Sequence, residues 1–413
     1  MPDEAAPSGA GSWAALSASF LGWTLDAFDF FLVSFCLTAI AREFHQSDRA
    51  VSYSIALTLA FRPVGAFLFG LMADRYGRRL PLMIDLVFYS VVEVATGFAP
   101  SFAVFLVLRA LFGIGMGGEW GVGASLAMEK VPPKWRGLLS GLLQQGYSLG
   151  YLLAAVAYPL VFPRFGWRPL FFLGGLPALL ALFVRLRVKE SEVWVQSGEK
   201  TWTHLGRKIL ANWKLFVYLA ILMTGMNLAS HGTQDMYPTF LQRYWHFGTS
   251  QRSVITAISM VGAILGGVCI GLLSDRLGRK RLIALSLAGA IVLTPLWAYA
   301  PRVGWLIAGA FLIQFFVQGA WGVIPAHLSE LAPTEIRGFL PGFAYQCGAL
   351  LAGSVGTFEA ALAEHMSYAT AMAATAATVF LFTIVIALLG PERKGVHFTD
   401  SPQFATGQTR SPA

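Results

Sequence analysis

Apolar runs of about 20 residues recur twelve times in this sequence and constrain its fold more than any other feature. A helix of that length crosses the hydrocarbon core of a bilayer. The runs cover residues 14–41, 51–73, 80–99, 102–126, 137–161, 168–187, 213–241, 252–273, 281–299, 303–326, 338–361 and 368–389. Of the 413 residues, 56% are hydrophobic and only 13% are charged. This composition is typical of an integral membrane protein. We therefore expect an all-α membrane protein with twelve transmembrane helices.

A polar stretch interrupts the pattern between the sixth and seventh runs. It predicts an N-terminal six-helix bundle at 1–187, a cytoplasmic linker at 188–212 and a C-terminal six-helix bundle at 213–390, followed by a cytoplasmic tail at 391–413. The N-terminus lacks the basic region of a cleaved signal peptide, so we expect the first run to be retained as a membrane helix.

The basic residues predict the orientation of the helices. The termini and the loops after the second, fourth, sixth, eighth and tenth runs hold about 21 of the 30 Lys and Arg. Cytoplasmic loops carry such an excess of positive charge. We therefore expect a multi-pass protein of the cell (inner) membrane with both termini in the cytoplasm. The formal net charge of +8 then reflects the membrane surface, and no nucleic-acid partner is expected.

The two halves repeat each other at a constant spacing of 201 residues. The segment 70–79 corresponds to 271–280, and several single positions follow the same spacing. These pairs are Asp74 and Asp275, Arg75 and Arg276, Arg78 and Arg279, Trp120 and Trp321, Glu129 and Glu330, and Arg136 and Arg337. Such a repeat is typical of secondary transporters whose two similar bundles share a central site. It predicts two pseudo-symmetric six-helix bundles around one cavity.

The seventh run carries an unusual polar face. On a helix, Asn227, His231, Gln234 and Asp235 fall within one arc of roughly 100°. Unpaired polar groups are costly in hydrocarbon, so this arc must face protein or water. We favour a binding face, with polar contacts between helices as the alternative. Pro238, one turn further on, favours a kink.

Charges within the membrane occur where the two halves differ. The partners of Arg62, Arg109, Glu119 and Asp26 at the 201-residue spacing are the uncharged residues Ala263, Ala310, Ala320 and Asn227. Buried ionisable groups mark a pathway or an ion pair. We expect Arg109 to bind a carboxylate through its guanidinium fork, with an ion pair to Glu119 or Asp26 as the alternative. For Arg62 we expect a structural ion pair with Asp26 or Asp29.

Two motifs resemble known transporters. The pattern Gly-x-x-x-Asp-Arg-x-Gly-Arg-Arg at 70–79, echoed at 271–280, resembles the loop motif of the major facilitator superfamily. The segment 227–239 resembles the Asn-x-x-[Ser/Thr]-His-x-[Ser/Thr]-Gln-Asp-x-x-x-Thr signature of the sialate:proton symporter family, which includes lactate permeases and sialic acid transporters. Its matching residues are Asn227, Ser230, His231, Thr233, Gln234, Asp235 and Thr239. Many sialate members have two extra helices between the halves, and their absence here favours a small monocarboxylate.

The resemblance implies the major facilitator fold and proton-coupled symport by alternating access. We expect a small organic anion, most simply a monocarboxylate such as lactate or pyruvate, together with protons. The residues expected to contact substrate are Arg109, Asn227, His231, Gln234 and Gln346. Those expected to couple protons are Asp235, Glu119, Asp26 and Asp29, with Asp235 and His231 able to share one proton. Gating or structural roles are expected for Arg62, Asp74, Arg75, Arg78, Asp275, Arg276 and Arg279.

Other functions remain open at this point. Sialic acid, a sugar or an aromatic acid are alternative substrates for the same fold, and a non-transporting receptor is a more distant alternative. An enzyme is not expected, because the sequence has no phosphate-binding loop, zinc-ligand spacing or nucleophile motif. We expect no catalytic residue, no cofactor and no metal, and nothing in the sequence demands more than a monomer.

Overall fold

The computed structural model describes residues 10–235, 237–352 and 355–398. The helices of the first half are α1 (Ala10–Glu43), α2 (Asp48–Tyr76), α3 (Arg79–Gly97), α4 (Phe102–Lys130), η1 (Pro133–Trp135), α5 (Arg136–Gln144), α6 (Gly146–Phe165), α7 (Arg168–Leu173) and α8 (Pro177–Arg187). Two short helices follow, α9 (Glu192–Gln196) and α10 (Trp202–Ala211). The second half comprises α11 (Trp213–Gln234), α12 (Tyr237–Arg243), α13 (Thr249–Leu277), α14 (Arg279–Ala298), α15 (Val303–Leu331), η2 (Thr334–Ile336), α16 (Leu340–Ala352), α17 (Val355–Leu362) and α18 (Tyr368–Leu389).

Ten helices in the described part of the chain are long and apolar enough to cross a membrane. The two remaining expected spans are present in pieces. The span expected at 168–187 consists of α7 and α8, and the span at 338–361 consists of α16 and α17, on either side of positions outside the described residues. The seventh span divides where Pro238 favours a kink, since α11 ends at Gln234 and α12 begins at Tyr237.

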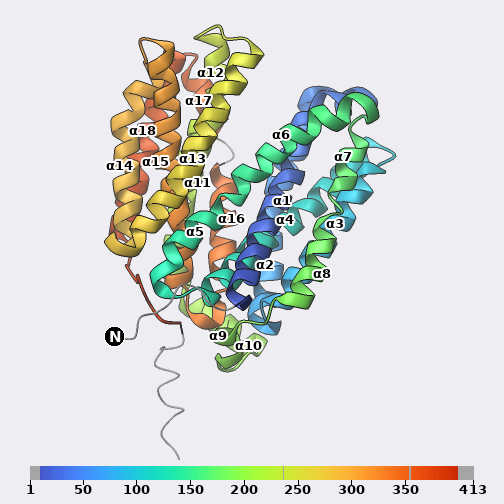
Figure 1. Cartoon of the computed structure of the whole chain (residues 1–413), viewed down its shortest axis with the longest axis vertical. Coiled ribbons are helices and arrows are strands. Elements are labelled where there is room, and N and C mark those ends of the chain that lie inside the picture. The colour runs from blue at the N-terminus through green and yellow to red at the C-terminus, as the bar shows by residue number, and fades with distance from the viewer. Residues whose placement is uncertain (1–9, 236, 353–354, 399–413) are drawn as a thin grey trace, which may run out of the picture.

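The helices form two groups that meet at one end and diverge toward the other (Figure 1). One group holds α1 to α4 and α6 to α8, and the other holds α11 to α15, α17 and α18, while α5 and α16 lie where the two groups meet. We call the end where they meet, next to α9 and α10, the linker side. The linker expected at 188–212 thus contains two short helices at the closed end of the molecule.

The repeated motif forms the same turn in both halves. Gly77 ends α2 with φ +101°, and Gly278 ends α13 with φ +102°. Residues with a β-carbon rarely adopt this conformation, so glycine is required for the chain to enter the next helix at once. The turn places Asp74 and Asp275 on the last helical turn before it. It places Arg78 and Arg279 at the start of the next helix.

Glycines let the two bundles approach each other closely near the linker side. A β-carbon added to Gly121 of α4 would lie 2.7 Å from the α-carbon of Gly342 in α16. Gly141 of α5, the repeat partner of Gly342, lies directly against the backbone of Gly267 in α13. Only hydrogen fits at such contacts, which are common where membrane helices pack tightly.

Candidate functional site

The polar residues of α11 line a cavity between the two bundles. This cavity has a volume of about 260 Å³, and Asn227, His231, Gln234 and Asp235 all contribute to its wall. The four side chains therefore share one space, as their helical spacing predicts. The first bundle supplies the opposite wall from α1, α2 and α6, including Arg62.

Hydrogen bonds hold this polar wall in place. His231 Nδ1 lies 3.2 Å from Asp235 Oδ2, and their side chains are 32% and 46% exposed, so both are accessible from the cavity. Gln234 donates to Gln314 Oε1 of α15 at 2.9 Å. Gln318, one turn further along α15, donates to Ser230 Oγ at 2.9 Å. The amide groups of α15 thus position α11, while the side chains of His231 and Asp235 bond to each other.

Arg62 brings a positive charge to the cavity. Its guanidinium carbon lies 5.6 Å from the centre of the Tyr345 ring, and its Nε and Nη2 atoms have no hydrogen-bond partner in the described part of the chain. No hydrogen-bonded ion pair with Asp26 or Asp29 is observed among the described residues, although Arg62 attracts the buried Asp26 carboxylate electrostatically. A buried cation with free donors is costly unless an anion occupies the space beside it.

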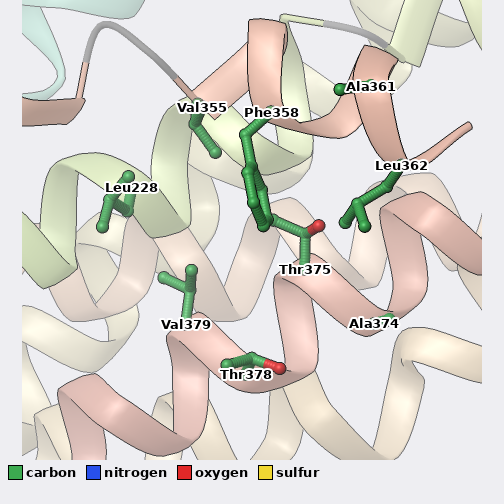
Figure 2. A pocket seen from close by; sticks show the side chains of 9 residues that line it. All are labelled: Leu228, Val355, Phe358, Ala361, Leu362, Ala374, Thr375, Thr378 and Val379. Carbon is green, nitrogen blue, oxygen red and sulfur yellow. The ribbon is translucent and has the colours of Figure 1, made fainter.

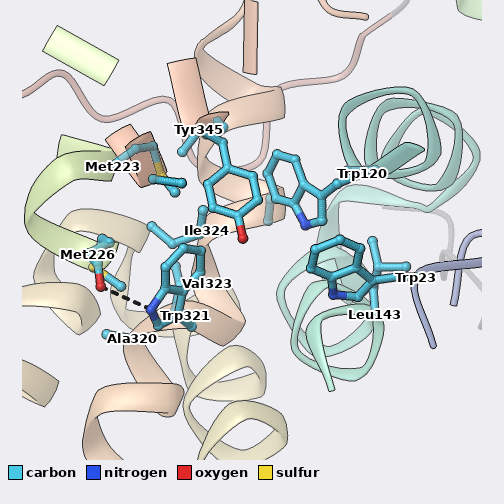
Figure 3. Packing of buried hydrophobic residues seen from close by; sticks show 14 of the residues in the cluster. Trp23, Trp120, Leu143, Met223, Met226, Ala320, Trp321, Val323, Ile324 and Tyr345 are labelled. Atoms are coloured by element: carbon cyan, nitrogen blue, oxygen red, sulfur yellow. Dashed lines mark hydrogen bonds between the residues drawn. The ribbon is translucent and has the colours of Figure 1, made fainter. Parts of the chain in front are cut away.

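Aromatic side chains form a further part of the wall. They are Phe30, Phe31, Tyr147, Trp321 and Tyr345. Tyr345 lies between the repeat-related tryptophans, with its ring centre 4.6 Å from that of Trp120 and 5.5 Å from that of Trp321 (Figure 3). Trp321 is fixed by a 3.2 Å hydrogen bond from its indole nitrogen to the Met226 carbonyl. The three rings join the two bundles, and two of them, Trp321 and Tyr345, line the cavity.

Arg109, in contrast, does not line the cavity. Its Nη2 donates to Glu93 Oε1 at 2.6 Å and to Thr96 Oγ1 at 3.0 Å, and its guanidinium carbon lies 4.7 Å from the centre of the Phe112 ring. The side chain is buried inside the first bundle. This arrangement corrects the expectation that Arg109 faces the substrate and the alternative pairing with Glu119 or Asp26. The physical reason is that Glu93 of α3 neutralises it at close range.

The other membrane acids expected to couple protons lie behind the cavity. Asp26, Asp29 and Glu119 are buried within the first bundle, and their carboxylate oxygens have no hydrogen-bond partner in the described part of the chain. Gln346 of α16 is also fully buried, with both amide atoms unpartnered in that part. None of these four residues contributes to the cavity wall.

A second, larger cavity of about 630 Å³ lies between α11, α17 and α18 (Figure 2). Its lining is aliphatic and aromatic apart from two threonines, Thr375 and Thr378. It offers no charged group to an ion, so we place the functional site in the smaller central cavity. Across the described residues, no group of three or more His, Cys, Asp or Glu is arranged to hold a metal ion.

The linker side is closed by the repeated motif. Asp74 accepts hydrogen bonds from the backbone nitrogens of Gly338 (2.8 Å) and Phe339 (2.9 Å) in the second bundle. Asp275 accepts from Gly137 (2.8 Å) and Leu138 (3.0 Å) in the first bundle. Each aspartate thus binds free backbone donors in the opposite bundle, where a negative charge is favourable at a helix start.

Arginines extend this network in both halves. Arg78 contacts Asp74 and Glu129, and Arg279 contacts Asp275 and Glu330. Burial acts to lower the pKa of Arg78, but the Glu129 and Asp74 carboxylates outweigh it and raise that pKa above its usual range. Arg75 and Arg276 belong to none of the ion pairs observed in the described residues.

Two further ion pairs cross between the bundles. Arg136 reaches Glu330 at 3.0 Å, and Arg337 reaches Glu129 at 3.3 Å. Arg136 and Arg337 are 201 residues apart, and so are Glu129 and Glu330. The two halves therefore contribute equivalent ion pairs to the closed end. Its contacts are possible only while the bundles meet on the linker side.

A family model described as Major Facilitator Superfamily matches residues 19–248 and 235–412. The chain belongs to the major facilitator superfamily. The match spans both bundles, and it confirms the fold that the apolar runs, the repeat and the loop motif predict.

Relatives within the superfamily agree with this assignment. The chain is 28% identical over 423 residues to a carboxylic acid transporter protein homolog of Saccharomyces cerevisiae, covering 92% of this chain and 68% of that protein. It is 30% identical over 388 residues to a probable 4-methylmuconolactone transporter of Cupriavidus pinatubonensis, covering 92% and 90%. It is 29% identical over 386 residues to the sialic acid transporter NanX of Escherichia coli, covering 91% and 93%.

A solved structure shows the same fold. The proton:xylose symporter XylE, bound to 6-bromo-6-deoxy-D-glucose, superposes with a TM-score of 0.76 at 20% identity, covering 93% of this chain and 97% of that one. Superfamily membership and the apolar helices make this chain a multi-pass membrane transporter, not an enzyme. These relatives are named as transporters of small organic molecules.

Sequence reasoning missed several residues of the cavity wall. The amide of Gln318 in α15 interrupts an apolar run, and that interruption was a usable signal. The pairing of Arg109 with Glu93 also had a signal, because the two residues are equally distant from the turn at Ser101 between antiparallel helices. The aromatic wall had no such signal, since membrane helices are rich in aromatic residues on every face.

Proposed function

We propose that this transporter is a proton-coupled symporter of a small organic anion, with a monocarboxylate such as lactate or pyruvate as the first candidate substrate. The single observation that carries the proposal is the guanidinium of Arg62, which reaches the central cavity with two atoms unpartnered in the described residues. A carboxylate of the substrate supplies the missing acceptor. Arg62 therefore takes the role that the sequence favoured for Arg109.

The polar wall of α11 supports recognition of the substrate's other end. His231 and Asn227 line the cavity opposite the first bundle, and Gln234 is anchored to α15. A hydroxyl or keto oxygen next to the carboxylate is the kind of group that an imidazole and an amide bind. Among the described residues that line the cavity, Arg62 is the one lysine or arginine. A single fixed cation favours a substrate with one carboxylate over a substrate with two.

Proton coupling is assigned to Asp235, paired with His231. The pair is accessible from the cavity, so a proton and a substrate meet in the same space. Loading of both leaves the net charge of the carrier unchanged. It neutralises the separate charges of Asp235 and Arg62, so the carrier is able to close around its cargo. The buried carboxyl groups of Asp26, Asp29 and Glu119 are the alternative proton carriers. Gln346 contacts substrate, as the sequence predicts, only if α16 rotates during closure.

Alternating access follows from the two-bundle arrangement. We propose that the linker side is cytoplasmic, as the basic loops predict, and that the structure represents the state closed to the cytoplasm. The network around Asp74 and Asp275 then acts as the inner gate, with Arg78 and Arg279 as its cations. We propose bundle boundaries at 1–187 and 213–390, a linker at 188–212, a tail at 391–413 and a monomeric protein.

An aromatic acid is a second candidate substrate, because five aromatic residues line the cavity. Planar rings stack on such walls with a gain of about 0.5–1.5 kcal/mol per favourable pair. Sialic acid or a sugar is the alternative substrate for the same fold.

The proposal is tested by uptake of labelled L-lactate into proteoliposomes under an inward proton gradient, with and without a protonophore. Gradient-dependent uptake that the protonophore abolishes is expected. Competition with unlabelled pyruvate, benzoate and sialic acid ranks the candidate substrates. Absence of proton-stimulated uptake for every acid, by protein that remains monodisperse, would refute proton-coupled anion symport. Saturable binding without uptake would identify the receptor alternative.

A further inference from the structure

The segment after α18 spans both bundles on the linker side. We call residues 391–398 the tail segment. It is anchored to the second bundle through Glu392, which accepts from the backbone nitrogens of Arg279 (3.2 Å) and Lys280 (3.0 Å). Lys394 adds a 2.8 Å bond to the carbonyl of Arg276. The tail segment thus follows the second bundle when that bundle moves.

The end of the tail segment reaches the first bundle. Arg136, at the start of α5, donates to the Val396 carbonyl at 3.0 Å. Phe398 is 4% exposed, and its ring lies between two guanidinium groups. Its centre is 3.9 Å from the guanidinium carbon of Arg136 and 3.8 Å from that of Arg337.

Arg136 and Arg337 are repeat partners, one from each bundle, and they carry the same charge. An aromatic ring has negative potential on both faces, so it can attract a cation on each side. Phe398 therefore separates two like charges and attracts both. Glu330 and Glu129 balance the two arginines from the outside through the crossed ion pairs.

We propose that Phe398 is a latch that holds the linker side closed. When the bundles separate on that side, Arg136 and Arg337 move apart, and one ring can retain at most one of them. The ring then stabilises the closed state and contributes little to the open state. The tail sets the ratio of the two states without contacting the central cavity.

The test measures the distance between the bundles in the full chain, without substrate. Cysteines are introduced at Lys134 of η1 and Leu277 of α13, two exposed sites on elements that contact each other across the bundles, after replacement of Cys36, Cys269 and Cys347. Spin labels at these sites report short and long distance populations in lipid nanodiscs. Because no substrate is needed, the result does not depend on what the protein transports.

Phe398→Ala is expected to lower the closed-to-open ratio about tenfold, through loss of two cation–π contacts. Phe398→Leu, which keeps apolar bulk without the ring, is expected to behave in the same way, whereas Phe398→Tyr keeps the wild-type ratio. Val396→Ala is the matched control, because the tail bonds through the Val396 backbone. Unchanged distances in Phe398→Ala would overturn the latch. So would an equal shift in Val396→Ala, or a wild-type ratio in Phe398→Leu, because each would remove the role of the ring.

Discussion

Arg109 and Glu93 form a buried ion pair at 2.6 Å inside the first bundle, and this pair accounts for the absence of Arg109 from the central cavity. Arg62, one helix away on α2, reaches the cavity instead. The two membrane arginines thus have different environments, although the sequence presents both as charges within apolar helices. The difference makes their roles separable by experiment.

Glu93→Gln is expected to destabilise the protein strongly. Removal of the carboxylate leaves Arg109 buried without its counterion, which costs about 3–5 kcal/mol. Thermal unfolding in detergent measures the loss. Glu93→Gln combined with Arg109→Met is expected to recover much of it, and the exposed Glu364→Gln serves as the control. Equal stability of Glu93→Gln and wild type would contradict the structural role of the pair.

Arg62→Lys is expected to weaken anion binding about tenfold, since loss of one charge-assisted hydrogen bond costs about 1.5 kcal/mol or more. Arg109→Lys is the matched variant, because it changes the same group at a site that does not line the cavity. Equilibrium binding of labelled substrate compares the two. A loss of affinity in Arg109→Lys with normal affinity in Arg62→Lys would restore the assignment that the sequence favoured.

Asp235→Asn is expected to abolish proton-driven accumulation and to preserve counterflow exchange, because the carboxamide cannot carry a proton. Asp235→Glu keeps the carboxyl group and is expected to retain part of the accumulation. Uptake with and without a pH gradient separates the two activities in proteoliposomes. If Asp235→Asn accumulated substrate at the wild-type level, Asp235 would not be the proton carrier. Glu119, Asp26 and Asp29 would then be the next candidates for that role.

Asp74→Asn is expected to slow turnover and to leave equilibrium binding of substrate near the wild-type value. The aspartate holds the amides of Gly338 and Phe339 from the other bundle, and a neutral side chain binds them less strongly. Asp275→Asn is expected to have a similar effect, because its contacts repeat the pattern. Asp48→Asn, at the opposite end of α2, is the control. Turnover at the wild-type rate in both motif variants would reject the gating role.

The α11 site could be anticipated from the sequence because its parts belong to one helix. Helical geometry alone places Asn227, His231, Gln234 and Asp235 on one face, and the cost of burying polar groups directs that face to a cavity. Partners on other helices could not be chosen in this way. Arg62 had several acids available in the first bundle, and only the packed helices show that none of them pairs with it in the described residues.

The contacts on the linker side were likewise predictable from the sequence only in part. The 201-residue repeat predicts that Asp74 and Asp275 have equivalent surroundings, and their contacts are indeed equivalent. No repeat or motif predicts Phe398, because the tail lies outside the apolar runs. Its position between Arg136 and Arg337 depends on three segments that are distant in sequence.

The sequence by itself determined the fold class, because each apolar run must cross the bilayer as a helix that satisfies its own backbone hydrogen bonds. It also determined the polar face of α11, since helical periodicity is a local property. Only the tertiary structure decided which arginine reaches the cavity, which acid neutralises the other, and which side chain closes the linker side. These choices depend on distances of a few ångströms between different helices, and the energy of a charged pair changes steeply over such distances.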